Sequence, residues 1–210
     1  HENRLKRIDK QILLHRQRLV DSDNGGIKIF THDAHYILKL PFNEVTCIRG
    51  GLTYRNNRFV YTATDDKNLA KRDSFENWGS TLLEYVFDNT IKKGLNTYYG
   101  LRAKAFGEYY RQIDRKKTDF FVLGYDIRHY QKIHRNFIWA NRFAASTSFG
   151  NQKLVYYMGG VDNWFFPQWN NATRVSTTQN YAYQTLATSM RGFNQNIRNG
   201  SSFSVINSEL

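Results

Sequence analysis

The stretch that decides the fold covers residues 95–109, LNTYYGLRAKAFGEY. Its odd-numbered positions carry no charge, whereas Arg102, Lys104 and Glu108 all fall on even-numbered positions. Because successive side chains of a strand point to opposite faces, this pattern predicts a long strand with one uncharged face and one charged face. Such a strand is typical of a transmembrane β-barrel wall, with lipid outside and water inside.

The segments on either side follow the same alternation. In residues 78–89 the acidic side chains Glu84 and Asp88 fall on the even positions, and residues 119–132 place Asp126 there as well. Residues 137–147 follow the rule less strictly, because Asn141 shares a face with Trp139. The sequence therefore predicts an all-β fold, a transmembrane antiparallel up-and-down β-barrel of which this chain forms a part.

Strand length and connection length are compatible with a membrane barrel, and the alternation alone fits a soluble β-sandwich or barrel equally well. The predicted strands reach about ten residues, which exceeds the ~5–6 of soluble sheets and approaches the ~9–11 that cross a bilayer. Short turns are expected at 56–57, 89–94 and 133–136, and long connections at 65–77 and after Phe149. Outer-membrane barrels have short periplasmic turns and long extracellular loops. Residues 153–160 also resemble a strand, but a further crossing there would break the alternation of short and long connections. We therefore expect them to lie within one long extracellular loop, residues 149–201.

The first 44 residues form a segment of different character. Apolar residues spaced three and four apart among basic residues predict a basic helix over residues 1–20. Either a solvated helix or linker, or contact with a membrane surface, fits that pattern. Short strands are expected at 27–30 and 36–40, closed by Pro41. A strand from Val45 then reaches a hairpin turn at Asn56-Asn57, since asparagine tolerates positive φ. Residues 45–210 form the partial barrel.

Composition leaves two classes of partner open. The formal charge of +12 and the pI near 9.8 suit nucleic acid or an anionic surface, whereas 16% aromatic residues suit strands and membrane interfaces. The positive charge is spread along the chain and alternates with acidic residues, which argues against nucleic acid. A soluble basic β-domain that binds nucleic acid and a passive porin-like barrel remain the alternatives. No apolar run approaches the ~18 residues of a membrane helix.

The sequence offers no candidate catalytic or metal-binding motif. The single Cys47 excludes an internal disulfide and a cysteine-based zinc site. His32, His35, His129 and His134 lack a third ligand at a known spacing. No nucleophile elbow, phosphate loop or paired-carboxylate motif is present. We therefore expect no enzymatic activity, no metal and no cofactor.

Several motifs, in their order and spacing, resemble the BamA-like barrels of the Omp85 family. Arg191-Gly192-Phe193 lies in a polar loop before an alternating strand, residues 202–210, and Gly159-Gly160 precedes it in the same loop. Residues 83–90 followed by Gly94 and residues 100–102 resemble the family's strand, aspartate turn and glycine-led strand. The resemblance covers residues 45–210, roughly the sixth to the twelfth strand of a barrel of about sixteen. The aromatic and asparagine-rich composition is similar to that of Bacteroidetes outer-membrane proteins.

The resemblance implies insertion or translocation of proteins at the bacterial outer membrane, or a scaffold role in such a machine. The partners would be outer-membrane lipid and client outer-membrane proteins or other subunits, with no nucleic acid.

It also implies that the loop tip folds back into the lumen, where Arg191 pairs with an acidic residue. A guanidinium suits bidentate pairing with a carboxylate, Gly192 permits a tight backbone, and Phe193 would wedge against lumen residues. The candidate acidic partners are Glu84, Asp88, Glu108, Asp126 and Glu209.

Overall fold

The computed structural model describes residues 9–21, 27–61, 72–94, 97–114, 118–135, 137–161, 168–170, 172–175 and 180–210, and the described residues form an all-β antiparallel fold. No helix in these described ranges is long and apolar enough to cross a membrane. The strands are β1 Asp9–Asp21, β2 Ile27–Pro41, β3 Thr46–Tyr61, β4 Ser74–Asp88, β5 Ile91–Gly94, β6 Thr97–Gln112, β7 Asp119–His134, β8 Phe137–Gly150, β9 Lys153–Met158, β10 Tyr181–Leu186, β11 Arg198–Gly200 and β12 Ser202–Glu209.

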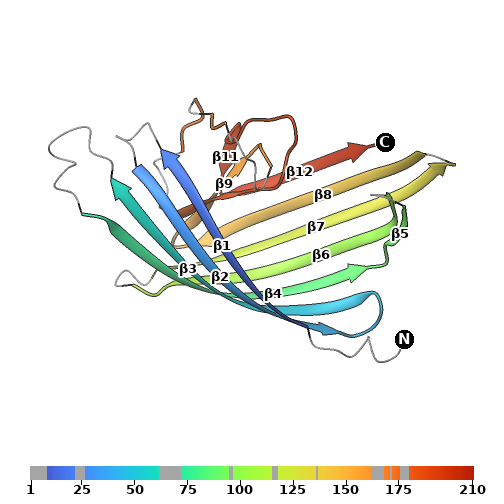
Figure 1. Cartoon of the computed structure of the whole chain (residues 1–210), viewed down its shortest axis with the longest axis horizontal. Coiled ribbons are helices and arrows are strands. Elements are labelled where there is room, and N and C mark those ends of the chain that lie inside the picture. The colour runs from blue at the N-terminus through green and yellow to red at the C-terminus, as the bar shows by residue number, and fades with distance from the viewer. Residues whose placement is uncertain are drawn as a thin grey trace.

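Most of these strands belong to one large sheet with up-and-down connectivity. Its order is β1-β2-β3-β4-β6-β7-β8-β12, with the short β5 paired to β6. Figure 1 shows that the strand direction rotates from β8 toward β1, as the right-handed twist of strands requires. Within the described residues β1 and β12 are the two edges of the sheet and do not pair with each other. The all-β, antiparallel, up-and-down prediction is confirmed at this level.

The alternating strands lie where the sequence placed them. β4, β6, β7 and β8 contain the four segments in which charged residues alternate with uncharged ones. The strand-like residues of β9 pair with β10 and β11 in a separate three-stranded sheet. The connection from β8 to β12 therefore runs from residue 151 to 201, in agreement with the predicted long loop.

Three local predictions near the N-terminus were wrong. Residues 1–8 of the predicted helix lie outside the described residues, and the remainder belongs to a strand, Asp9–Asp21, which pairs along its length with β2. The two short strands expected at 27–30 and 36–40 are one strand, β2. The turn expected at Asn56-Asn57 lies within β3, and the real turn between β2 and β3 is residues 42–45.

The asparagine pair has a structural role other than a turn. Asn57 is fully buried and accepts a hydrogen bond from Thr31 Oγ1 on β2, at 3.0 Å. Asn56 donates from Nδ2 to Asn77 Oδ1 on β4, at 2.7 Å. Their side-chain amides therefore join β3 to both neighbouring strands. Turn propensity considers only residues adjacent in the sequence, so it does not predict such contacts.

The large sheet has an apolar outer face. Large apolar side chains stand exposed there; they are Leu52, Tyr54, Leu83, Tyr85, Phe121, Leu123, Tyr125, Ile127, Trp139, Phe149 and Ile206. Polar side chains also lie on this face; among them His129 and Asn141 are direct register partners near the start of β8. Aromatic rings form a row at the other end of the face, where Tyr109, Phe121 and Phe149 pack in sequence.

The opposite, inner face carries the core. Trp78 of β4, together with Phe120 and Val122 of β7, packs against Leu154 and Tyr156 of β9. Ala182 of β10 completes this buried cluster. In Figure 1 β9 and β11 lie beside β8 and β12. The long connection between β8 and β12 therefore returns to cover part of the inner face.

Candidate functional site on the inner face

An aromatic and cationic contact fixes the three-stranded sheet to the wall. The guanidinium carbon of Arg55 on β3 lies 3.7 Å from the ring centroid of Tyr183 on β10. The Tyr183 ring also meets Trp78, Tyr110 and Phe120 edge-on. Arg55 is further held by Asp33 at 3.6 Å and by the Oδ1 of Asn57 at 3.0 Å. Arg55 therefore connects β2, β3 and the folded-in segment.

Of two tyrosines that anchor the folded-in segment, Tyr156 is buried and Tyr183 is partly buried. The Tyr156 hydroxyl lies 3.0 Å from the Ser146 hydroxyl of β8, and burial raises the pKa of Tyr156 to about 12. Burial likewise raises the pKa of Tyr183, and the neighbouring Arg55 opposes this only in part. Both phenols therefore stay neutral throughout the ordinary pH range.

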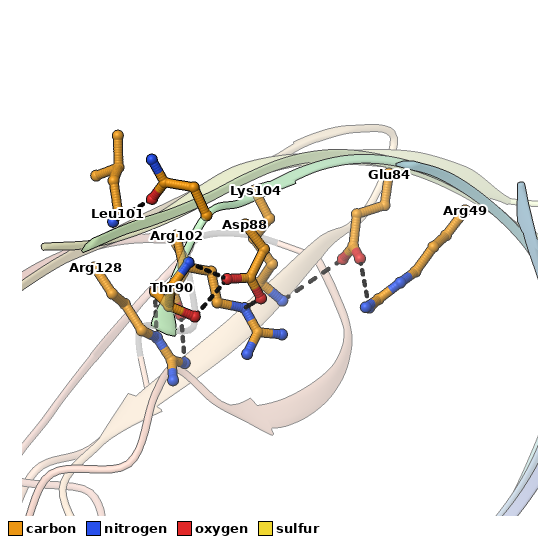
Figure 2. Close-up of polar contacts among 10 residues, drawn as sticks. Arg49, Glu84, Asp88, Thr90, Leu101, Arg102, Lys104 and Arg128 are labelled. Atoms are coloured by element: carbon orange, nitrogen blue, oxygen red, sulfur yellow. Dashed lines mark hydrogen bonds and ion pairs between the residues drawn. The ribbon is translucent and has the colours of Figure 1, made fainter. Parts of the chain in front are cut away.

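Further along the inner face, away from the core, lies a group of ion pairs. Glu84 lies between Arg49 Nη1 at 2.9 Å and Lys104 Nζ at 3.6 Å. Figure 2 shows these three side chains projecting from one side of the sheet. Only 8% of the Glu84 side chain is exposed, and the close pairing with Arg49 offsets the cost of burying its charge.

The end of β4 is organised by Asp88. Its Oδ1 accepts hydrogen bonds from the backbone N–H and the hydroxyl of Thr90, at 3.1 and 2.6 Å, and its Oδ2 lies 3.5 Å from Arg102 Nε. Both contacts are visible in Figure 2. Gly100 has a φ of +119°, and a Cβ there would lie 2.8 Å from the Asn89 carbonyl oxygen. The aspartate turn and the glycine-led strand thus meet in space.

Asp126 lies between two arginines. Its carboxylate accepts two hydrogen bonds from Arg128 of the same strand, both 3.0 Å, and two from Arg142 of β8, 3.3 and 2.7 Å. The Asp126 side chain is 9% exposed. Two guanidiniums therefore bind one carboxylate, each through two nitrogens.

The loop motif and the paired glycines are adjacent in space. The N–H of Gly160 donates to the Phe193 carbonyl oxygen at 2.9 Å, and the Met190 N–H donates to the Gly160 carbonyl oxygen at 2.7 Å. Arg191 and Gly192 form the turn between these contacts, with a φ of +82° at Gly192. Gly159 has a φ of +99°, and a Cβ there would overlap the Asn194 carbonyl oxygen. Glycine is therefore needed at position 159, where the backbone of residue 194 approaches closely.

The pairing that the resemblance implied for Arg191 is not found in the described part of the chain. Arg191, Gly192 and Phe193 are all exposed, and Arg191 forms no ion pair with a described acidic residue. The pairing with an acidic residue elsewhere stays a prediction.

The five candidate acidic partners share the inner face, and four of them contact other side chains. Glu84, Asp88 and Asp126 pair with the lysine and arginines named above. Glu108 accepts a hydrogen bond from Ser80 at 2.7 Å. Register places Glu209 opposite Ala140, on the inner face, where it is exposed.

Several contact residues were missed by sequence reasoning. Arg55, Tyr156 and Tyr183 carry the docking of the folded-in segment, and Arg128 and Arg142 clamp Asp126. Strand parity places Arg128 and Arg142 on the charged face, but it does not indicate that both contact Asp126. No local sequence signal indicates that Tyr183 contacts Arg55. The two residues meet only because the long connection between β8 and β12 folds back onto the sheet.

The described residues contain no group of three or more His, Cys, Asp or Glu side chains placed to hold a metal. His35 Nδ1 instead lies 2.9 Å from the Thr53 hydroxyl. The fold and site define a class of structure: a curved antiparallel wall, apolar outside and ionic inside, with a long connection folded onto its inner face. No protein family model, curated protein or solved structure matches this chain.

Proposed function

We propose that this chain is part of an Omp85-like outer-membrane β-barrel, which inserts or translocates proteins at the bacterial outer membrane or scaffolds such a machine. The observation that carries the proposal is the outer face, where large apolar side chains of five strands of the same sheet, β3, β4, β7, β8 and β12, are exposed together. Soluble monomers rarely expose an apolar patch of that extent. Lipid contact would remove this surface from water.

Strand length supports a bilayer-crossing role. β3, β6 and β7 each contain 16 residues, which is more than the ~9–11 that a tilted strand needs to cross a bilayer. The polar pair His129 and Asn141 lies toward the turns at one end of the outer face, and the aromatic row lies toward the other. Aromatic girdles at both interfaces are a feature of such barrels.

The folded-in connection supports the Omp85-like role over a passive porin. Residues of β9 and β10 pack on the inner face, and the Gly159-Gly160 pair contacts the Arg191-Gly192 turn. The implied mechanism is non-enzymatic: a weakly closed barrel seam offers strand edges to client proteins while the loop stabilises the lumen. This mechanism rests on analogy with the family. A passive porin-like barrel is favoured instead by the exposed position of Arg191.

The open edges at β1 and β12 set a condition on the proposal. Lipid does not tolerate unpaired backbone groups. Further strands, from this polypeptide or another, must therefore complete the barrel, and outer-membrane lipid and client or partner proteins would be its contacts.

The nucleic-acid alternative makes a separate prediction. Glu84 and Asp126 each engage two of the cations on the inner face, which leaves fewer cations for phosphate backbones than the net charge of +12 suggests. If nucleic acid is the partner, the purified protein should bind single strands with a steep salt dependence.

Cell fractionation combined with heat-modified gel migration tests the membrane assignment. We expect the protein in the outer-membrane fraction, with a band that shifts on heating. Leu123→Arg on the outer face should block assembly, at a cost of about 2–4 kcal/mol at mid-bilayer. Lys104→Ala on the inner face is the matched control and should assemble. A soluble protein without a heat shift, or equal tolerance of both variants, would overturn the proposal.

A further inference from the structure

Three arginines stand side by side across the inner face. Arg102 of β6 is the direct register partner of Arg128 of β7, and Arg128 is the partner of Arg142 of β8. Neighbouring strands are only ~4.8 Å apart, and like charges directly opposite each other destabilise a sheet. This set of three residues, the arginine row, therefore needs negative charge nearby.

The carboxylates of the protein neutralise the arginine row incompletely. Asp126 serves both Arg128 and Arg142, and Asp88 lies 3.5 Å from Arg102. Toward the core, Glu84 is likewise shared by two cations, Arg49 and Lys104. Five cations thus share three carboxylates on this part of the inner face. Lys39, the register partner of Arg49, adds a further cation.

The arginine row has donors and solvent access to spare. Arg128 and Arg142 contact Asp126 through Nε and Nη2, so Nη1 of each is not engaged by that carboxylate, and the Tyr130 side chain is a further hydrogen-bond partner of Arg128. The Arg102 contact is longer than the ~2.7–2.9 Å of a charge-assisted hydrogen bond. The side chains of Arg102, Arg128 and Arg142 are 42%, 36% and 26% exposed. Figure 2 shows Arg102 and Arg128 on the same side of the sheet.

We propose that the arginine row binds a phosphate-class oxyanion that bridges Arg102 and Arg128. A tetrahedral oxyanion directs its oxygens in several directions, so it can accept from two guanidinium forks on neighbouring strands. The planar carboxylate of Asp126 already fills the position between Arg128 and Arg142. This site concerns the inner face only and is independent of whether the outer face meets lipid. The phosphate can be free or belong to a phosphomonoester headgroup of a lipid.

Calorimetric titration of the detergent-purified protein tests the site. The probes are inorganic phosphate and mixed micelles that contain phosphatidic acid, both at constant ionic strength. Arg102→Gln should weaken binding about tenfold or more, because a charge-assisted contact is lost. Arg102 lies outside the Asp126 clamp, so this variant is expected to fold. Arg111→Gln, on the outer face of the same strand, is the matched control and should leave the affinity unchanged.

A second variant separates anion binding from structural support. Asp126→Asn removes the internal anion between two arginines, so phosphate should bind at least about threefold more tightly. If Asp126 only supported the fold, its substitution by asparagine would not raise the affinity for phosphate. Binding of both probes indicates a general oxyanion site, and binding of the micelles alone identifies a lipid headgroup; either result supports the proposal.

Three outcomes would overturn it. The first is equal phosphate affinity of the unmodified protein and Arg102→Gln. The second is equal weakening by Arg111→Gln, which would indicate general charge attraction. The third is tight binding of a polyglutamate peptide with no response to phosphate, which would assign the arginine row to an acidic polypeptide segment.

Discussion

The guanidinium of Arg55 lies over the ring of Tyr183, 3.7 Å from its centroid, and so joins strand β3 of the wall to strand β10 of the folded-in connection. These two residues are far apart in the sequence, and each has further partners on its own side of the contact. Arg55 is held by Asp33, and Tyr183 packs among Trp78, Tyr110 and Phe120. Substitutions at this contact therefore test how firmly the long connection is attached to the inner face.

Removal of the Arg55 side chain should loosen that connection. Arg55→Ala loses a buried cation–π contact of about 2 kcal/mol and leaves Asp33 without its cation, at a cost of about 3 kcal/mol or more. We expect faster proteolysis within residues 151–201 and a lower free energy of unfolding in urea. Tyr183→Phe keeps the ring and serves as the control. If Arg55→Ala and Tyr183→Phe give the same proteolysis rate as the unmodified protein, the contact does not hold the connection.

Two positive-φ glycines of this loop, Gly159 and Gly192, should respond differently to alanine. At Gly159 a Cβ overlaps the Asn194 carbonyl oxygen, whereas at Gly192 nothing lies within 4 Å. Gly192→Ala should cost only the ~1–2 kcal/mol of the left-handed conformation. Gly159→Ala adds a backbone clash and should detach the turn at residues 190–193, with a clearly larger loss in thermal stability. Equal losses for the two variants would contradict the close approach of Gly159 to Asn194.

Arg191→Ala should leave stability within about 0.5 kcal/mol of the unmodified protein, the usual effect of a surface substitution away from special contacts. The reason is that Arg191 is exposed and forms no ion pair with a described acidic side chain. Urea unfolding in detergent measures this. A loss of about 2 kcal/mol or more would instead show that Arg191 pairs with an acidic group outside the described residues, as the family resemblance implies.

Stability should fall in alkali because of Tyr156. Its pKa is raised from 10.0 to about 12 in the folded protein, so the unfolded chain loses this proton first. The folded state therefore loses stability as the pH rises from about 10 to about 12, by roughly 1.4 kcal/mol for each pH unit. Tyr156→Phe should reduce this part of the alkaline loss, as measured by unfolding at pH 9 and pH 11. An identical pH dependence in Tyr156→Phe would refute the assignment to Tyr156.

The alternation of residues 95–109 predicted β6 and its two faces because the relevant physics is local: side chains of a strand alternate, and charge separates by face. The same reasoning placed β4, β7 and β8. It also placed β9 outside the large sheet, because the alternation of connections does not admit another crossing.

The wrong predictions concern residues whose structure depends on pairing with other strands of the sheet. Asn56 and Asn57 are hydrogen-bonded to Asn77 and Thr31 on neighbouring strands, and the first strand is held by its backbone ladder with β2. The periodicity of apolar residues along a single segment does not predict either interaction. The docking of Tyr183 on Arg55 and the register that aligns Arg102, Arg128 and Arg142 also depend on strand pairing and could not be predicted from the sequence.

The most direct test of the proposed lipid-facing outer surface is site-specific labelling in membranes isolated from cells that express the protein. Cys47→Ser provides a background without the one native cysteine, into which Leu123→Cys and Lys104→Cys are introduced separately. A polarity-sensitive dye at position 123 should report an apolar environment and be quenched by a lipid-phase quencher. The same dye at position 104 should respond only to a water-soluble quencher. Quenching from the aqueous phase at both positions would contradict a membrane wall.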